Sequence, residues 1–330
     1  MPNLSKKSTA QQKIAETEAL LKTIEIANPR FEAHVLIAHS LQIDRFTLLR
    51  DRERVISEEE ELRLNKIVSR RLQYEPIPYI LKKQEFWNLP FQVTPDVLIP
   101  RPWSEEIVTN VLNAIENGLK ADRILELGVG SGCLLLSILS ELPDSQGVGV
   151  DLSSKALKIA AINAQNLGMS KRTQFIKSNW GQEVTGLFDI IVANPPYLTT
   201  SDYDFLKKPM REYEPRSAYM SGKDGLSDYK VLAPDIKRLL APKGQVFLEA
   251  DASRKYLITD VFKKHNFTLT HEFDNTINAF LTLRYSDVSA TADKRHNNPT
   301  DVSATADKRH NNPTDVSATA DSRHNSPTNK

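Results

Sequence analysis

From residue 123 onward, short apolar runs alternate with longer amphipathic stretches. The apolar runs predict strands at 123–127, 148–151, 173–176, 188–193 and 245–249, with two later ones near 268–273 and 279–284. Helical stretches at 133–142, 154–167 and around 231–240 separate the first five. Apolar strands that alternate with helices are typical of a parallel sheet covered on both faces. The pattern therefore predicts an α/β fold, whose ligands bind beyond the C-terminal ends of the strands.

The first 75 residues have helical periodicity instead. Pro29 suits the first turn of one helix, and Ser57 with Glu60 forms a capping-box pattern before an apolar face that includes Leu64. Residues 76–102 are rich in proline, which forbids a long helix and favours a hairpin or an extended connector. Ser104 is expected to cap a following helix.

A repeat begins at Asp287. The segment 287–330 holds three copies of a fourteen-residue unit, DVSATADKRHNNPT in the first two, without an aromatic residue, leucine or isoleucine. Such a composition cannot bury enough surface to order itself, so a disordered appendage is predicted. Its histidines lie fourteen residues apart and make a poor metal site, and no metal is expected. The expected organisation is a helical domain at 1–75, a connector at 76–102, an α/β domain at 103–286 and this tail.

Charge and cysteine content narrow the classes of protein. The chain has 43 basic and 42 acidic side chains, so no broad basic field favours non-specific nucleic-acid binding. A single cysteine, Cys133, excludes an internal disulfide framework. Neither a membrane span nor the apolar core of a secretory signal is apparent. A cytoplasmic protein is expected, with a mitochondrial one less favoured.

A glycine-rich loop follows the first strand. It reads Gly128–Val129–Gly130–Ser131–Gly132 and leads into a helix, and its glycines let the backbone approach a bound nucleoside. A dinucleotide fingerprint would need glycine at position 133, so a nicotinamide dehydrogenase is disfavoured. Asp151 ends the second strand, where an acid can accept both ribose hydroxyls. The alternative is an acid that caps the next helix.

The fourth strand ends in Asn194–Pro195–Pro196–Tyr197. The prolines stop the strand and remove two backbone donors. The side-chain oxygen of Asn194 and the carbonyl of Pro195 can then each accept a hydrogen bond from one NH2 group, and Tyr197 offers a flat face to a planar amide or base. The alternative is a proline-stiffened loop with a packed tyrosine.

With these motifs together, the chain resembles the HemK/PrmC family of protein-glutamine N5-methyltransferases. The resemblance covers residues 10–285. It rests on the stretches 76–80, 85–87, 98–102 (LIPRP), 126–132, 188–197, 214–215 and 224–226. It implies a class I S-adenosylmethionine-dependent fold with a Rossmann-like seven-stranded sheet and a small N-terminal helical domain. It also implies the glutamine of a release-factor GGQ loop as the substrate, with no nucleic acid or membrane required.

The same resemblance implies roles for individual residues. Gly128, Val129, Gly130, Ser131 and Gly132 would hold the methionine end of the cofactor, Asp151 the ribose and Trp180 the adenine. Asn194, Pro195, Pro196 and Tyr197 would hold the glutamine, with Asn194 also near the cofactor and Asn194, Pro195 and Tyr197 catalytic. The helical domain would dock the release factor.

Some positions depart from the family pattern. Lys82 stands where the connector normally has glycine, and Trp103 and Ser104 replace an Asp–Thr pair. Asn179 replaces a common aspartate, and the stretch Glu249–Ala250–Asp251 lacks the usual glycine. These departures concern cofactor affinity and connector geometry. They are expected to leave the corner formed by Asn194–Pro195–Pro196–Tyr197 untouched.

Two rival functions remain open. An N6-adenine or other exocyclic-amine methyltransferase acting on DNA or RNA would use the same corner to grip the adenine NH2 group, but the balanced charge counts against it. A non-catalytic scaffold with a methyltransferase-like fold is the other.

Overall fold

The computed structural model describes residues 8–24, 26–275 and 277–286. The predicted tail at 287–330 lies outside the described residues. The N-terminal part is helical, as predicted. Its helices are α1 (Ala10–Lys22), α2 (Pro29–Ser40), α3 (Arg45–Arg50), α4 (Glu58–Leu72) and α5 (Ile77–Leu81). Their apolar faces share one core that includes Ile14, Leu36 and Leu64.

Two helix starts in this part follow the sequence signals. Pro29 occupies the first turn of α2, and the capping box between Ser57 and Glu60 is present at the start of α4. The Ser57 side chain accepts from the Glu60 backbone N–H, and the Glu60 carboxylate accepts from the Ser57 N–H. Both predictions are confirmed.

The connector contains the expected hairpin. Strands β1 (Lys83–Phe86) and β2 (Leu89–Gln92) pair antiparallel. Trp87 and Asn88 form the two-residue turn with φ of 52° and 55°, the left-handed conformation that fits the twist of a tight hairpin. Lys82 also lies in the left-handed region, with φ 56°, at the end of α5.

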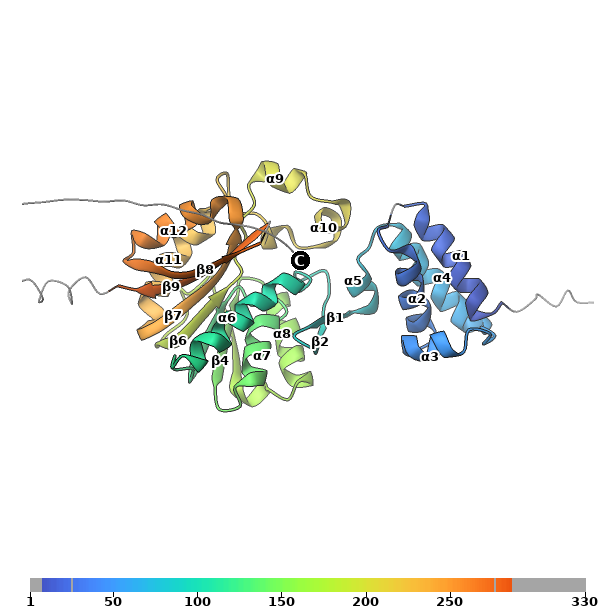
Figure 1. Ribbon diagram of the computed structural model, residues 1–330, viewed down its shortest axis with the longest axis horizontal. Helices are drawn as coiled ribbons and strands as arrows, with labels where there is room; N and C mark the ends of the chain where they lie inside the picture. The colour runs from blue at the N-terminus through green and yellow to red at the C-terminus, as the bar shows by residue number, and fades with distance from the viewer. Residues whose placement is uncertain (1–7, 25, 276, 287–330) are drawn as a thin grey trace, which may run out of the picture. The chain divides into compact units, whose positions relative to one another are not determined.

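A seven-stranded sheet forms the centre of the second part (Figure 1). Its strands are β3 (Arg123–Leu127), β4 (Gln146–Asp151), β5 (Thr173–Lys177), β6 (Phe188–Ala193), β7 (Leu240–Asp251), β8 (Phe267–Asp274) and β9 (Asn278–Tyr285). The order is β5-β4-β3-β6-β7-β9-β8, and β9 runs antiparallel to both neighbours. The strand order reverses between β3 and β6, so the loops after these two strands lie side by side.

Helices cover both faces of this sheet (Figure 1). The remaining helices are α6 (Glu105–Glu116), α7 (Cys133–Glu141), α8 (Ser154–Asn166), α9 (Thr200–Asp204), α10 (Lys208–Tyr213), α11 (Ser227–Leu239) and α12 (Lys255–Lys263), with single 3₁₀ turns at Pro102–Ser104, Ser170–Arg172, Arg216–Ala218 and Ala252–Arg254. Alternate residues of β6 enter two cores: Ile190 packs with α6 and α7, and Ile191 with α11 and α12. This is why the strands read as continuously apolar in the sequence.

The structure corrects two local predictions. Ser104 precedes α6 but gives no side-chain cap to it, because its hydroxyl bonds elsewhere. The fifth strand of the sheet is longer than predicted: β7 begins at Leu240 and not at residue 245, and the preceding helix begins earlier, at Ser227.

Candidate active site

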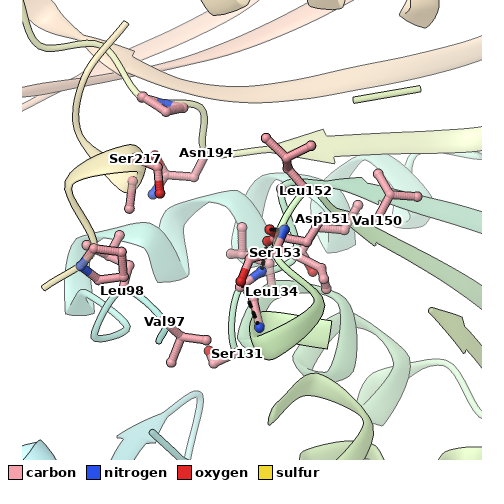
Figure 2. Close-up of a pocket in the computed structure, with 18 of the residues that line it drawn as sticks. Val97, Leu98, Ser131, Leu134, Val150, Asp151, Leu152, Ser153, Asn194 and Ser217 are labelled. Atoms are coloured by element: carbon pink, nitrogen blue, oxygen red, sulfur yellow. Dashed lines mark hydrogen bonds between the residues drawn. The ribbon is translucent and has the colours of Figure 1, made fainter. Parts of the chain in front are cut away.

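A cavity of about 620 Å³ opens at the C-terminal ends of β3, β4 and β6. Its lining comes from the glycine loop, the end of β4, the segment 178–180, the end of β6, the connector at 95–101 and the segment 215–220. Figure 2 shows Asn194 and Ser217 on one side of this cavity and Asp151 and Ser153 on another. The cavity lies where parallel sheets of this order hold their ligands.

The glycine loop is tied to the neighbouring strand. Gly128, Gly130 and Gly132 have φ of 81°, 52° and 82°, a region that other residues enter only at a cost. The N–H groups of Gly128 and Val129 donate to the Val150 carbonyl at 2.9 and 2.8 Å. The loop therefore needs its glycines to turn, and its conformation is held by backbone bonds to β4.

Asp151 extends this attachment with its side chain. Its Oδ2 accepts from the Gly130 N–H at 3.0 Å, and its Oδ1 accepts from the Ser153 N–H at 2.8 Å. Burial raises the pKa of the Asp151 carboxyl, although these two bonds favour its ionised form. Because each carboxylate oxygen can accept more than one hydrogen bond, Asp151 keeps acceptor capacity toward the cavity it lines.

Trp180 lies against the loop from the other side. A Cβ at position 128 would come within 3.2 Å of its ring, which is a second reason for glycine there. The indole Nε1 donates to Asp228 Oδ1 at 3.2 Å, and burial raises the pKa of that carboxyl. Leu152 also lines the cavity and is 66% exposed, so this end offers apolar surface to a flat ring.

Glu126, to which no motif in the sequence gives a role, also lines the cavity. It is 2% exposed at the end of β3, and its Oε2 accepts from the Leu135 N–H at 2.9 Å, within the first turn of α7. Burial raises the pKa of Glu126 well above its usual range, and the nearby charge of Asp151 acts in the same direction. The sequence signal that could have found Glu126 is an acidic residue inside an otherwise apolar strand. Burial of an acid is costly unless it is hydrogen-bonded or paired, so such a residue indicates a specific role.

The structure places the four residues after β6 differently from one another. Asn194 and Pro196 line the cavity, whereas Pro195 and Tyr197 do not, and neither does Gly132 of the loop. Pro195 is buried, and the Tyr197 hydroxyl donates to Asn278 Oδ1 at 3.3 Å while its ring packs on the core. Burial raises the pKa of Tyr197. Tyr197 thus supports this corner, and its ring does not line the cavity.

A buried carboxylate stands behind Asn194. Glu249 of β7 is 1% exposed; its Oε2 accepts from the Ser104 hydroxyl at 2.5 Å and its Oε1 from Trp103 Nε1 at 3.1 Å. Asn194 Nδ2 in turn donates to Ser104 Oγ at 3.4 Å. The expectation that the departures at Trp103 and Ser104 leave Asn194 untouched is therefore wrong, because both side chains bond Glu249 and one of them contacts the Asn194 amide. Burial raises the pKa of Glu249 to about 7, although these bonds and the charge of Arg101 favour its ionised form.

A buried ion pair joins the connector to the segment after α10. Arg101 Nη2 donates to Glu214 Oε1 at 2.6 Å and to the Tyr219 hydroxyl at 2.7 Å. Glu214 Oε2 also accepts from the Ile99 N–H at 3.2 Å. These contacts unite two of the sequence stretches on which the family resemblance rests, 98–102 and 214–215. Arg101 and Pro215 of these stretches line the cavity.

Within the described residues, no group of three or more histidine, cysteine, aspartate or glutamate side chains is arranged to hold a metal ion. In the same part of the chain, every helix is too short or too polar to cross a membrane.

The sheet order, with a glycine loop after its first strand and a cavity at the point of reversal, defines a class I methyltransferase. A family described as "Methyltransferase small domain" matches residues 106–208, and one described as "PrmC N-terminal domain" matches residues 12–81. Similar solved structures include a ribosomal protein L11 methylase from Lactobacillus delbrueckii subsp. bulgaricus, with 18% identity and a TM-score of 0.43 over 57% of this chain and 81% of that one.

Curated relatives narrow the class to a family. The release factor glutamine methyltransferase of Buchnera aphidicola subsp. Schizaphis graminum is 38% identical over 78% of this chain and 92% of its own length. That of Caulobacter vibrioides is 37% identical over 74% of this chain and 84% of its own. The chain belongs to the release factor glutamine methyltransferase family, which confirms the resemblance read from the sequence.

Proposed function

We propose that the protein transfers a methyl group from S-adenosylmethionine to the side-chain amide nitrogen (N5) of the glutamine in the GGQ loop of a peptide-chain release factor. Methylation of a release-factor glutamine is the activity of the family. The observation that carries the finer proposal is the position of Asn194, whose amide lies at the cavity directly after β6. A side-chain oxygen there can accept from the NH2 group of a substrate amide.

The residues at the other end of the cavity suit the cofactor that this class of enzyme uses. When bound, S-adenosylmethionine would supply an electrophilic methyl group on a sulfonium, with S-adenosylhomocysteine as the leaving group that keeps the electron pair of the broken S–C bond and with one N–H proton released after transfer. Gly128, Gly130 and Ser131 line the cavity with the close backbone approach that a polar ligand needs. Asp151 offers carboxylate acceptors to ribose hydroxyls, and Trp180 and Leu152 offer apolar surface to a base. We assign the cofactor to these residues.

The amide end must make a poor nucleophile react. The lone pair of an amide nitrogen is delocalised into its carbonyl, so the nitrogen attacks only when it is held in a productive geometry. Acceptance of one N–H bond by Asn194 Oδ1 would favour a pyramidal nitrogen. The second acceptor expected from the sequence, the Pro195 carbonyl, belongs to a residue that does not line the cavity, so we assign only the bond to Asn194. The Asn194 dipole would also stabilise the positive charge that develops on nitrogen during transfer. Positioning supplies most of the acceleration in this scheme.

We assign recognition of the protein substrate to the N-terminal helices. A second hollow, of about 630 Å³, lies among α2, α4 and the end of α5. Its described lining includes Arg63, Lys66, Arg70 and Lys82 and no acidic side chain. Arg63 pairs with Glu59 and Arg70 with Glu75, so Lys66 and Lys82 supply most of the charge offered to a partner. This charge suits an acidic segment of a partner protein, because complementary charge speeds docking.

Substitution Lys66→Glu tests this assignment. We expect KM for the release factor to rise about three- to tenfold with kcat little changed, because the charge acts on docking. Lys22→Glu, which makes the same charge change on α1 away from the hollow, is the matched control. Removal of residues 1–75 should raise KM further. An unchanged KM in both Lys66→Glu and the deletion would refute the assignment.

The reaction itself is tested by transfer of a labelled methyl group. Purified protein and labelled S-adenosylmethionine are incubated with a release factor, with its GGQ glutamine-to-alanine variant, and with DNA and RNA. We expect label on the unaltered release factor alone. Equal labelling of both release factors, or labelling of nucleic acid only, would contradict the proposal, and the latter would favour an amino-methyltransferase of nucleic acids. Absence of S-adenosylmethionine binding in calorimetry would favour a non-catalytic scaffold.

A further inference from the structure

Glu249 has no part in holding the cofactor or the substrate. Its carboxylate is buried and bonds Ser104, which lines the cavity. We propose that Glu249 is a positioning residue, which acts through Ser104 to fix which end of the Asn194 amide faces the substrate. The inference deepens the proposed function and rests on it, since it concerns how Asn194 receives a glutamine NH2 group.

The three side chains come from distant parts of the sequence: Ser104 and Asn194 line the cavity, and Glu249 lies behind them. Ser104 is 3% exposed and Glu249 1% exposed, so water does not compete for their hydrogen bonds. The Ser104 hydroxyl and Trp103 Nε1 donate to opposite oxygens of the Glu249 carboxylate. Both oxygens of the ionised carboxylate, the form present above its pKa of about 7, are therefore engaged as acceptors.

This arrangement fixes the direction of the hydrogen bonds. A hydroxyl has one proton to donate, and Ser104 gives it to Glu249. Toward Asn194, Ser104 can then only accept, so it faces the amide nitrogen Nδ2, at 3.4 Å. The Asn194 oxygen consequently points away from Ser104. Reversal of the amide would place two acceptors against each other and would present an NH2 group to the substrate NH2 group.

A neutral amide at position 249 would change the direction of these hydrogen bonds. Glutamine has one oxygen and one NH2 group, so it cannot accept from both Trp103 and Ser104. If its oxygen serves Trp103, its NH2 group donates to Ser104, whose own proton then turns toward Asn194 and favours the reversed amide. Removal of the Trp103 donor would free the glutamine oxygen for Ser104 and restore the original direction.

The test compares kcat, KM for the release factor and S-adenosylmethionine affinity at about pH 8.5, where Glu249 is ionised. Five variants are measured: Ser104→Ala, Ser104→Thr, Glu249→Gln, Trp103→Phe and the double variant Trp103→Phe/Glu249→Gln. Ser104→Ala and Glu249→Gln should each lower kcat about tenfold or more, as expected for loss of a buried hydrogen bond to a charged group. Cofactor affinity should stay within about twofold, because no cofactor contact is altered. Ser104→Thr keeps the hydroxyl and should recover most of kcat.

The double variant separates orientation from mere packing. Its kcat should exceed that of Glu249→Gln, whereas two independent structural losses would add and make it lower. Wild-type transfer to the release factor is measured first: if it fails, the proposed function fails, and if it succeeds, the variants judge the inference alone. The inference is overturned by wild-type kcat in both Glu249→Gln and Ser104→Ala, by parallel loss of cofactor binding, or by a double variant no better than Glu249→Gln. Should Glu249→Gln not fold, the contrast between Ser104→Ala and Ser104→Thr decides.

Discussion

The two ends of the cavity are built from contacts of very different range along the chain. At the cofactor end, Asp151 bonds the N–H groups of Gly130 and Ser153, 21 and 2 positions away. At the amide end, Ser104 bonds Glu249 and Asn194, which lie 145 and 90 positions away. At the first end, the glycine loop and its acid are complete within two neighbouring strands and their loops, and only Trp180 comes from farther along the chain. The second needs β6, β7 and the connector together.

This difference separates affinity for the cofactor from the capacity to use it. Substitutions at the cofactor end should act on S-adenosylmethionine binding, and those at the amide end on transfer. Both ends bury acids whose pKa values are raised, Glu126 at the first and Glu249 at the second. Each end thus buries an acid whose charged form is destabilised by burial and is favoured only in part by its hydrogen bonds.

The largest effect is expected from Asn194→Ala. This variant removes the oxygen that we assign to the substrate amide, so kcat should fall by at least about 100-fold, the scale of losing one preorganised hydrogen-bonding group in a transition state. S-adenosylmethionine binding, measured by calorimetry, should stay within about threefold because the Asp151 contacts remain. A parallel loss of cofactor affinity would show that the two ends are not separable.

The opposite pattern is expected from Asp151→Ala. Loss of a charged acceptor for ribose hydroxyls should weaken S-adenosylmethionine binding roughly 10- to 100-fold, and kcat at saturating cofactor should fall far less. The exposed Asp144→Ala variant serves as the control for removal of an acid from this part of the chain. If Asp151→Ala left affinity unchanged, Asp151 would serve only to hold the loop.

Most strand positions could be predicted because burial on both faces leaves a plain apolar run. Positions 123–127 and 188–193 coincide with β3 and β6. The cofactor end could be predicted as well, since its glycines and its acid follow one another within a single strand–helix–strand unit. The short helices α9 and α10 after β6 lack any such periodic run.

The support for the amide end could not be read from local patterns. Ser104 carries the signal of a helix cap, but its hydroxyl instead meets Glu249, whose position depends on the whole sheet. Arg101 and Glu214 were each noted as parts of matching stretches, yet nothing local indicates that they form an ion pair. Long-range partners of this kind are set by tertiary packing, which the spacing of residues along the chain does not reveal.

The pH dependence of stability offers a further comparison. Folded Glu249, with its pKa raised from 4.5 to about 7, keeps its proton in a range where the unfolded chain has lost it. Between these values, wild-type stability should fall with rising pH relative to Glu249→Gln, by about 3 kcal/mol over the window. The charges that bear on Glu249 include Arg101, which favours ionisation, and the pKa values of Tyr197 and Tyr229 are themselves raised by Glu249.

Denaturant unfolding of both proteins from pH 5 to pH 8 measures this difference. Coincident pH profiles for wild type and Glu249→Gln would mean that Glu249 is ionised throughout and that the amide end carries no titrating charge in this range.

The smallest effect is expected from Lys82→Gly. Lys82 holds φ 56° at the end of α5, a conformation that glycine adopts without a Cβ penalty, although glycine also loses more entropy on folding. We expect a gain in unfolding free energy below about 1 kcal/mol, with cofactor affinity and kcat unchanged. A change in either would mean that connector strain reaches the cavity.

The central claim, that this chain methylates a glutamine side chain held by Asn194, is tested most directly by locating the methyl group. A release factor incubated with the protein and S-adenosylmethionine is digested and analysed by tandem mass spectrometry. The account predicts one methyl group on the side-chain amide of the GGQ glutamine, and none with the Asn194→Ala variant. A methyl group on another residue, or full modification by Asn194→Ala, would contradict it.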